Sequence, residues 1–166
     1  FENPRQGSAW LARNIDSLRV LQTQASAHAF KQGMMHGDLR ADNILMSFGR
    51  NYIIDWPNAC IGPVVFDVLM FSAHLESLGG AATEKLIEAY DKTAGTDFAR
   101  PDMSADVFYM AASMAGYFAD QAYRMVPEKM PRLRWMQKSL LCALLQLLAR
   151  HGRIESPPRF AGMNSI

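Results

Sequence analysis

The chain has 166 residues, of which 49% are hydrophobic and 20% charged, with 17 basic side chains against 16 acidic ones. This composition is typical of one folded domain and excludes a disordered or low-complexity chain. No apolar stretch reaches the roughly 20 residues that cross a bilayer, and two cysteines are too few for a secreted disulfide framework. We therefore expect a cytoplasmic protein with no membrane partner.

The near-zero net charge conceals a gradient along the chain. Residues 71–128 hold nine acidic and four basic side chains, whereas residues 129–166 hold one acidic and seven basic ones. An acidic segment of this kind attracts cationic ligands. No basic stripe is interleaved with aromatic residues, so we expect no nucleic-acid partner.

The hydrophobic pattern predicts one helix, then a hairpin, then more helices. Apolar residues recur at three- and four-residue steps between Ser8 and Phe30, which predicts an amphipathic helix that Gly33 ends. Two short β-prone runs at 43–47 and 52–55 flank a turn with Gly49 and predict a hairpin. The remaining pattern predicts helices over 64–78, 83–93, 104–123 (capped by Ser104) and 131–150.

These elements indicate an α+β fold that is mainly α, with one small β-hairpin. We expect a single domain over residues 1–166. Its parts are a leading helix (1–33), a loop and hairpin (34–63), a helical bundle (64–153) and an irregular tail (154–166).

The chemistry-bearing residues gather around the hairpin. If the hairpin is centred on Gly49, Asn43 lies directly opposite Asp55, with Cβ atoms about 5 Å apart. Asp38 lies a few residues earlier, in a polar loop. Amide and carboxylate oxygens suit Mg²⁺, which completes its coordination with water and substrate phosphates. The pattern therefore predicts a phosphoryl-transfer site.

Two segments carry a family resemblance: His36-Gly37-Asp38-Leu39 with Asn43, and Ile53-Ile54-Asp55-Trp56. They resemble the catalytic and metal-binding loops of the aminoglycoside phosphotransferase and choline kinase family of small-molecule kinases. The resemblance covers residues 36–67 and implies the C-terminal lobe of a protein-kinase-like fold. It further implies that Asp38 accepts or orients the proton of a substrate hydroxyl, while Asn43 and Asp55 hold Mg²⁺ against the phosphates of ATP or GTP.

Three further residues have expected roles near this loop. Arg40 either offsets the charge of the transferred phosphoryl group or is a plain surface arginine. His36 is expected to be a packed histidine that hydrogen-bonds loop backbone. Asp67 lies in an apolar run, where an unpaired carboxylate is costly to bury, and the resemblance implies that it accepts N–H groups of the catalytic loop.

The acceptor is expected to be a small molecule. Only twelve residues separate Asp55 from Asp67, too few for a segment that binds peptide substrates. The acidic segment 71–128 favours a cationic acceptor such as an aminoglycoside.

The Gly-rich loop and the strand lysine that kinases place on the phosphates are missing from the sequence, which starts at Phe1 without an initiator Met. We therefore expect an N-terminal nucleotide lobe in cis outside this sequence, and little activity from this part alone. Two alternatives stay open: a non-catalytic kinase-like binding or scaffold domain, and a metal-dependent phosphate hydrolase.

Overall fold

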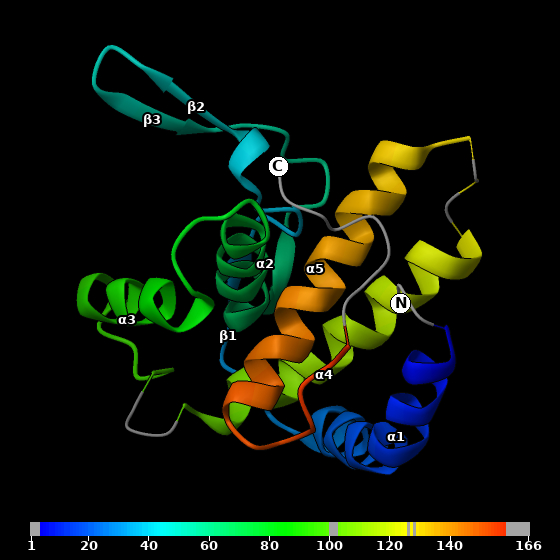
Figure 1. Ribbon diagram of the computed structural model, residues 1–166. Helices are drawn as coiled ribbons and strands as arrows, with labels where there is room; N and C mark the ends of the chain where they lie inside the picture. The colour runs from blue at the N-terminus through cyan, green and yellow to red at the C-terminus, as the bar shows by residue number, and fades with distance from the viewer. Residues whose placement is uncertain (1–3, 100–102, 126, 128, 159–166) are drawn as a thin grey trace.

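The computed structural model describes residues 4–99, 103–125, 127 and 129–158. Within these ranges the chain forms helices and two small antiparallel sheets (Figure 1). In chain order the elements are α1 (Pro4–Ala27), β1 (Gln32–Met35), the 3₁₀ turn η1 (Ala41–Asn43), β2 (Ile44–Ser47), β3 (Arg50–Ile53), β4 (Cys60–Pro63), α2 (Val64–Ser77), α3 (Thr83–Ala94), α4 (Ala105–Asp120), the π-helical turn η2 (Gln121–Met125) and α5 (Pro131–Arg150). The mainly α character of an α+β fold is confirmed.

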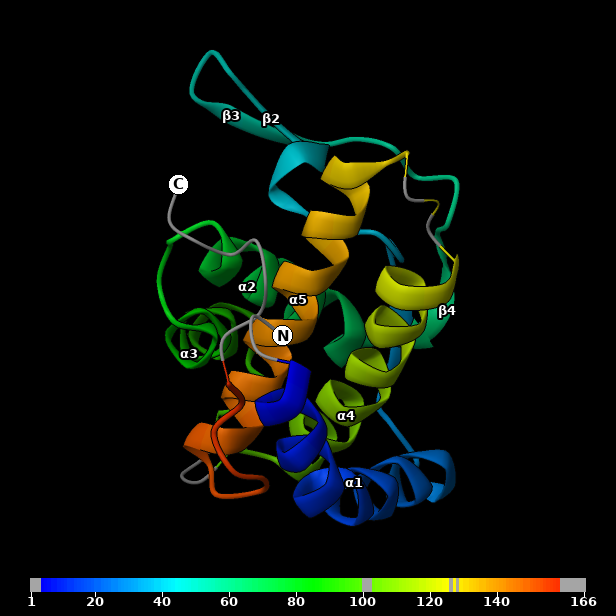
Figure 2. The same ribbon diagram turned by 45° about the vertical axis from the view of Figure 1, so that its right-hand side comes forward.

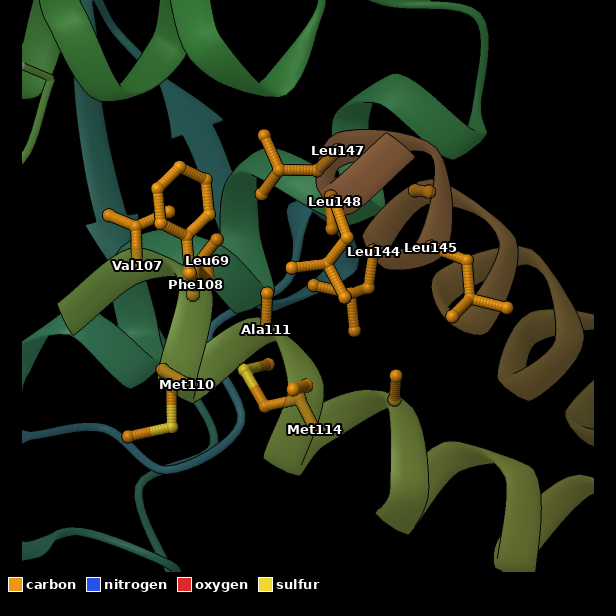
Figure 3. Close-up of a cluster of buried hydrophobic side chains, with 14 of the residues drawn as sticks. Leu69, Val107, Phe108, Met110, Ala111, Met114, Leu144, Leu145, Leu147 and Leu148 are labelled. Atoms are coloured by element: carbon orange, nitrogen blue, oxygen red, sulfur yellow. The ribbon is translucent and has the colours of Figure 1, made fainter. Parts of the chain in front are cut away.

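The core lies where α2, α4 and α5 meet. Figure 3 shows Leu69 of α2, Ala111 of α4 and Leu144 of α5 among the side chains that gather there. Each of these three is fully buried. The apolar run near the end of α5 forms one side of this core, because its closely spaced leucines make most of the helix surface apolar there, with Gln146 exposed among them. This packing fixes the positions of the helices that flank the site.

The later helix boundaries largely follow the sequence signals. Helix α5 spans the predicted residues, with Pro131 at its first turn. Helix α3 ends before Gly95, which takes the left-handed conformation (φ 65°). Helix α4 starts after Ser104 as expected, but the Ser104 hydroxyl is buried without a hydrogen-bond partner and does not cap the helix. The predicted 104–123 helix also changes to the π-helical η2 after Asp120.

The expected role of Gly33 is wrong, and the structure has a second strand pair that the sequence analysis did not predict. Helix α1 ends at Ala27, and Gly33 lies inside β1, which pairs with β4 in the register Gln32↔Pro63. A Cβ at Gly33 would stand 2.7 Å from Cγ1 of Val64, so only glycine fits there. These strands have four residues each and pair across a long stretch of sequence, so neither periodicity nor a turn signal marks them.

The predicted hairpin is present as β2 and β3, which project away from the helical body in both Figure 1 and Figure 2. Its turn consists of Phe48 and Gly49, both left-handed (φ 48° and 71°), as a two-residue type I′ turn requires. The expected register was one residue off. Ile54, whose N–H donates to the Asn43 carbonyl at 3.0 Å, faces Asn43 in place of Asp55.

The end of the chain is irregular where it is described. Residues 154–158 contain no helix or strand, and the rest of the predicted irregular tail, 159–166, lies outside the described residues. In the part of the chain that the structure describes, no helix combines the length and the apolar character that a membrane crossing needs.

The core predicts a strong effect of truncation at Leu144. Leu144→Ala should lower the free energy of unfolding by about 2–5 kcal/mol, because it removes buried methyl groups and leaves a cavity. Urea unfolding followed by circular dichroism measures the change. The control is Gln146→Ala, at an exposed position of the same helix, which should change stability by less than about 0.5 kcal/mol. Equal losses in the two variants would contradict this placement of the core.

Candidate active site

The loop that follows β1 carries the predicted catalytic residue. Gly37 has φ 79°, and a Cβ there would stand 2.6 Å from the backbone oxygen of Asn58. The loop therefore needs glycine for its conformation and for its close approach to the chain before β4. This turn places Asp38 between the two small sheets.

Asp67 holds this loop from the first turn of α2. Its Oδ2 accepts a hydrogen bond from the His36 N–H at 2.5 Å, and its Oδ1 accepts one from the Gly37 N–H at 3.0 Å. Such charge-assisted bonds are stronger than neutral ones, and the N-terminus of a helix stabilises a carboxylate. These are the contacts expected of Asp67, which thus braces the loop against α2.

His36 links the loop to the hairpin. The imidazole is buried, its Nε2 donates to the Ile54 carbonyl at 2.8 Å, and its Nδ1 accepts from the Asp38 N–H at 3.2 Å. The partners therefore assign the neutral Nε2–H tautomer. The Trp56 ring lies 4.7 Å from the imidazole between centroids, and its indole N–H donates to the Ile53 carbonyl. Both ring nitrogens of His36 thus form hydrogen bonds to the backbone of the loop and the hairpin.

His74 is a site residue that the sequence analysis missed. It is buried, and its Nδ1 accepts a hydrogen bond from the Ala41 N–H at 3.1 Å. Burial lowers the pKa of His74. His74 follows Asp67 by seven residues on α2, so both lie on the helix face that meets the loop. That spacing is the signal that could have found it.

Asp38 lies in a small network of charges. Its Oδ1 is 3.3 Å from Nη1 of Arg40, and the Asn43 amide donates to the Asp38 carbonyl at 2.9 Å and to its Oδ2 at 3.4 Å. Arg40 also binds Asp42 through two hydrogen bonds of 3.0 and 3.2 Å. Burial raises the pKa of Asp38, and the lowering by the Arg40 guanidinium does not outweigh it. The structure thus brings Asp38, Arg40 and Asn43 together.

Asp55 stands apart from this network. Among the described residues, none forms a hydrogen bond or ion pair with its exposed carboxylate. Its backbone is left-handed (φ 64°), a strained conformation for a non-glycine residue that is typical of functional sites. In an extended strand, successive side chains point to opposite faces of the sheet. A left-handed residue breaks this alternation, so the hairpin register does not fix the face on which the Asp55 carboxylate lies.

Asn43 and Asp55 carry the types of oxygen donor that a hard cation takes. The Asn43 amide nitrogen donates to Asp38 in the loop, while the amide oxygen accepts no hydrogen bond from the described parts of the chain. One amide oxygen and one free carboxylate suit Mg²⁺ when phosphates and water complete its shell. No cluster of three or more His, Cys, Asp or Glu side chains that could hold a metal occurs within the described ranges.

A pocket of about 340 Å³ opens beside Asp38. The loop after β1 forms one side of it, and α2, α4 and α5 form the other. Its described lining consists of Gly37, Asp38, Arg40, Asn58, Phe66, Met70, Tyr117, Phe118, Met136, Gln137 and Leu140. This volume is within the range of small-molecule pockets.

The acidic segment does not line this pocket as expected. Residues 71–128 contribute Tyr117 and Phe118, and none of their described carboxylates reaches it. Two of these carboxylates, Glu76 and Glu84, both bind Arg150, at 2.8 and 2.6 Å. The acidic segment therefore gives no carboxylate to the described wall of this pocket.

The brace predicts a stability loss at Asp67. Asp67→Ala should lower the free energy of unfolding by about 2–4 kcal/mol, because two buried N–H groups lose their acceptor. Thermal unfolding measures the change, with Asp97→Ala at an exposed position as the control. A variant as stable as this control would rule out the brace.

The lowered pKa of His74 predicts a pH-dependent contribution to stability. As pH falls below about 6.5, the unfolded chain takes up a proton at His74 before the folded one does, so folding loses stability until pH passes the lowered pKa. In His74→Asn the amide oxygen can still accept the Ala41 N–H but does not titrate. Its Tm should therefore fall less steeply than that of the wild type below about pH 6.5. Parallel curves of Tm against pH would contradict this.

One comparison with known proteins identifies a family for this chain. Residues 2–105 match the model of the phosphotransferase enzyme family, while no curated protein and no solved structure matches the chain. The matched region is more than half of the chain and includes the catalytic loop, the hairpin and α2 with Asp67 and His74. Helix α5 lies beyond it. The chain belongs to the phosphotransferase enzyme family.

Proposed function

We propose that this chain carries the reaction centre of a kinase that transfers the terminal phosphate of ATP or GTP to a hydroxyl group of a small molecule. The observation that carries the proposal is the position of Asp38. It is a partly buried carboxylate with a raised pKa, beside a cation, at the edge of a pocket of small-molecule size. Membership of a phosphotransferase family supports the reaction class.

Asp38 acts on the hydroxyl of the acceptor. An acceptor in the pocket presents its hydroxyl to the carboxylate, which orients the O–H and takes its proton as the oxygen attacks phosphorus. A raised pKa makes the ionised carboxylate a stronger base than an exposed aspartate. The Asn43 amide and the Arg40 guanidinium hold the carboxylate in place by contacts to its two oxygens.

Arg40 balances charge at the same point. Its side chain is largely buried and is shared between Asp38 and Asp42. When Asp38 becomes protonated, one of the two negative charges beside Arg40 disappears. The guanidinium is then free to stabilise the negative charge on the transferred phosphoryl group.

Asn43 and Asp55 are the residues that would hold Mg²⁺. Their free oxygens suit this cation, and when bound it neutralises charge on the nucleotide phosphates. The strained backbone of Asp55 favours this role, because strain persists where the surrounding structure and the chemistry require it.

The nucleotide also needs a second lobe in cis, for which the exposed strands provide a surface. Met34 of β1, Met46 of β2 and Ile61 of β4 are all more than two-thirds exposed, and so is Phe48 at the tip of the projecting hairpin (Figure 1). Exposed apolar side chains on short two-stranded sheets are typical of a surface that another element covers. A lobe in this position would bring the missing glycine-rich loop and lysine to the phosphates.

The proposal predicts loss of transfer in Asp38→Asn of the full-length protein. Without a carboxylate to accept the proton, kcat should fall by at least about 100-fold. Tm should not fall, because the substitution removes a charge that burial disfavours. The measurement is nucleotide consumption with a panel of hydroxylated small molecules, with Asp97→Asn as the matched control.

Two results would overturn the proposal. If Asp38→Asn keeps the wild-type kcat, Asp38 is not the base. If the wild type binds nucleotide but consumes none with any hydroxylated acceptor, the domain is a binding or scaffold module.

A further inference from the structure

His74 has a hydrogen-bond donor that the fold does not use. Its Nδ1 accepts from the Ala41 N–H, so the neutral ring carries its proton on Nε2, away from that bond. Burial lowers the pKa of His74 and so favours this neutral form. None of the described residues accepts the Nε2–H, and Nε2 is not among the fully buried side-chain atoms that lack a partner. Solvent therefore reaches this donor, although the residue is only 5% exposed.

The donor belongs to a hollow that adjoins the pocket beside Asp38. This hollow has a volume of about 570 Å³, and its described lining consists of His74, Pro131, Arg132, Trp135 and Met136. All but His74 belong to the first two turns of α5. Met136 also lines the pocket beside Asp38, so the two cavities are neighbours. An acceptor whose hydroxyl faces Asp38 can therefore extend past Met136 into the hollow.

The polar side chains of the hollow offer donors and no strong acceptor. His74 contributes its imidazole N–H, Trp135 an indole N–H and Arg132 its guanidinium. Arg132 is exposed and forms no hydrogen bond or ion pair with another described residue. A guanidinium presents its N–H groups as a planar fork that matches the oxygens of a carboxylate or a phosphate. The hollow thus has the donor pattern of a site for an oxyanion.

The charges around the two cavities favour the same kind of ligand. Asp38 is the one carboxylate of their described lining, and Arg40 pairs with it. Asp42, whose charge also acts on His74, lies outside that lining and receives two hydrogen bonds from Arg40. Arg132 therefore leaves the described lining with one net positive charge. An anionic group offsets this charge, whereas an ammonium group would be repelled by it.

We propose that the hollow formed by His74, Arg132 and Trp135 is a subsite for an anionic group, a carboxylate or a phosphate, on the acceptor alcohol. This inference rests on the proposed phosphotransferase function and names the substrate class of that site. Arg132 and His74 bind the oxyanion, and Met136 contacts the carbon chain that joins it to the reacting hydroxyl. Binding at this second point orients the hydroxyl toward Asp38.

The first test compares Arg132→Met with Arg19→Met in the full-length protein. Both substitutions remove one positive charge from an exposed position, so Arg19→Met controls for net charge. The acceptors are hydroxy carboxylates and phosphate monoesters with a free hydroxyl, each with a neutral amide or methyl counterpart and an amine counterpart. We expect the wild type to prefer the anions. Arg132→Met should raise their KM about 10- to 100-fold with little change in kcat, and Arg19→Met should not.

Two further variants separate charge from hydrogen-bond geometry. Arg132→Lys keeps the charge and loses the planar fork, so the KM of the anions should lie between those of the wild type and Arg132→Met. In His74→Asn the amide oxygen can still accept the Ala41 N–H, but the shorter side chain places no donor at the position of Nε2. The KM of the anions should rise about tenfold in this variant.

A binding measurement tests the subsite without catalysis. In full-length protein labelled with ¹⁵N-histidine, benzoate or inorganic phosphate should shift the Nε2 resonance of His74, which is the signal that His74→Asn lacks. Benzamide should not shift it, and Arg132→Met should strongly reduce the response to the anions. No shift with either anion would overturn the inference.

The outcomes separate this inference from the function on which it rests. If the wild type transfers phosphate but prefers neutral or amine acceptors, or if Arg132→Met leaves the KM of the anions unchanged, the subsite is wrong and the proposed function stands. Preference for carboxylates alone or for phosphates alone supports the subsite and identifies its ligand. If the wild type transfers phosphate to no alcohol, the proposed function fails, and the assignment of the anion to an acceptor alcohol fails with it.

Discussion

The site depends on two hydrogen bonds, which the backbone N–H groups of His36 and Gly37 donate to the carboxylate of Asp67. It joins α2, which is anchored in the core through Leu69, to a loop that has no regular structure of its own. The second contact from the same helix, His74 on Ala41, holds the other end of the loop. Two side chains of one rigid helix thus fix both the beginning and the end of the segment that presents Asp38. Catalytic groups need this rigidity, because small displacements of a base from its substrate reduce the rate strongly.

The charged side chains of the loop are arranged around Arg40. Arg40 lies between Asp38 and Asp42 and keeps two partly buried carboxylates tolerable in one small volume. Burial nevertheless dominates at Asp38 and raises its pKa. Protonation of Asp38 is therefore easier than that of an exposed aspartate, and it would free Arg40 from its contact with the Asp38 carboxylate. In the proposed mechanism, proton uptake by Asp38 would therefore also release Arg40 to stabilise the transferred phosphoryl group.

The sequence predicted most of the helices and the hairpin, but not how these elements pack against one another. Pro131 and the turn with Gly49 mark boundaries through local backbone chemistry, so reasoning from short sequence windows found them. Strands β1 and β4 were missed because their pairing depends on the fit of Gly33 against Val64, which no short window contains. The hairpin register failed by one residue because the turn has two residues and is centred between Phe48 and Gly49.

The projecting hairpin has a consequence for the behaviour of the chain in solution. Its two strands present unpaired backbone N–H and C=O groups along both outer edges, next to exposed apolar side chains. Such edges are templates for strand addition by a second copy. A net charge of +1 provides almost no long-range repulsion between copies near neutral pH. Whenever the hairpin is uncovered, colloidal stability becomes the limiting property of this protein, and it depends on concentration while the fold itself does not.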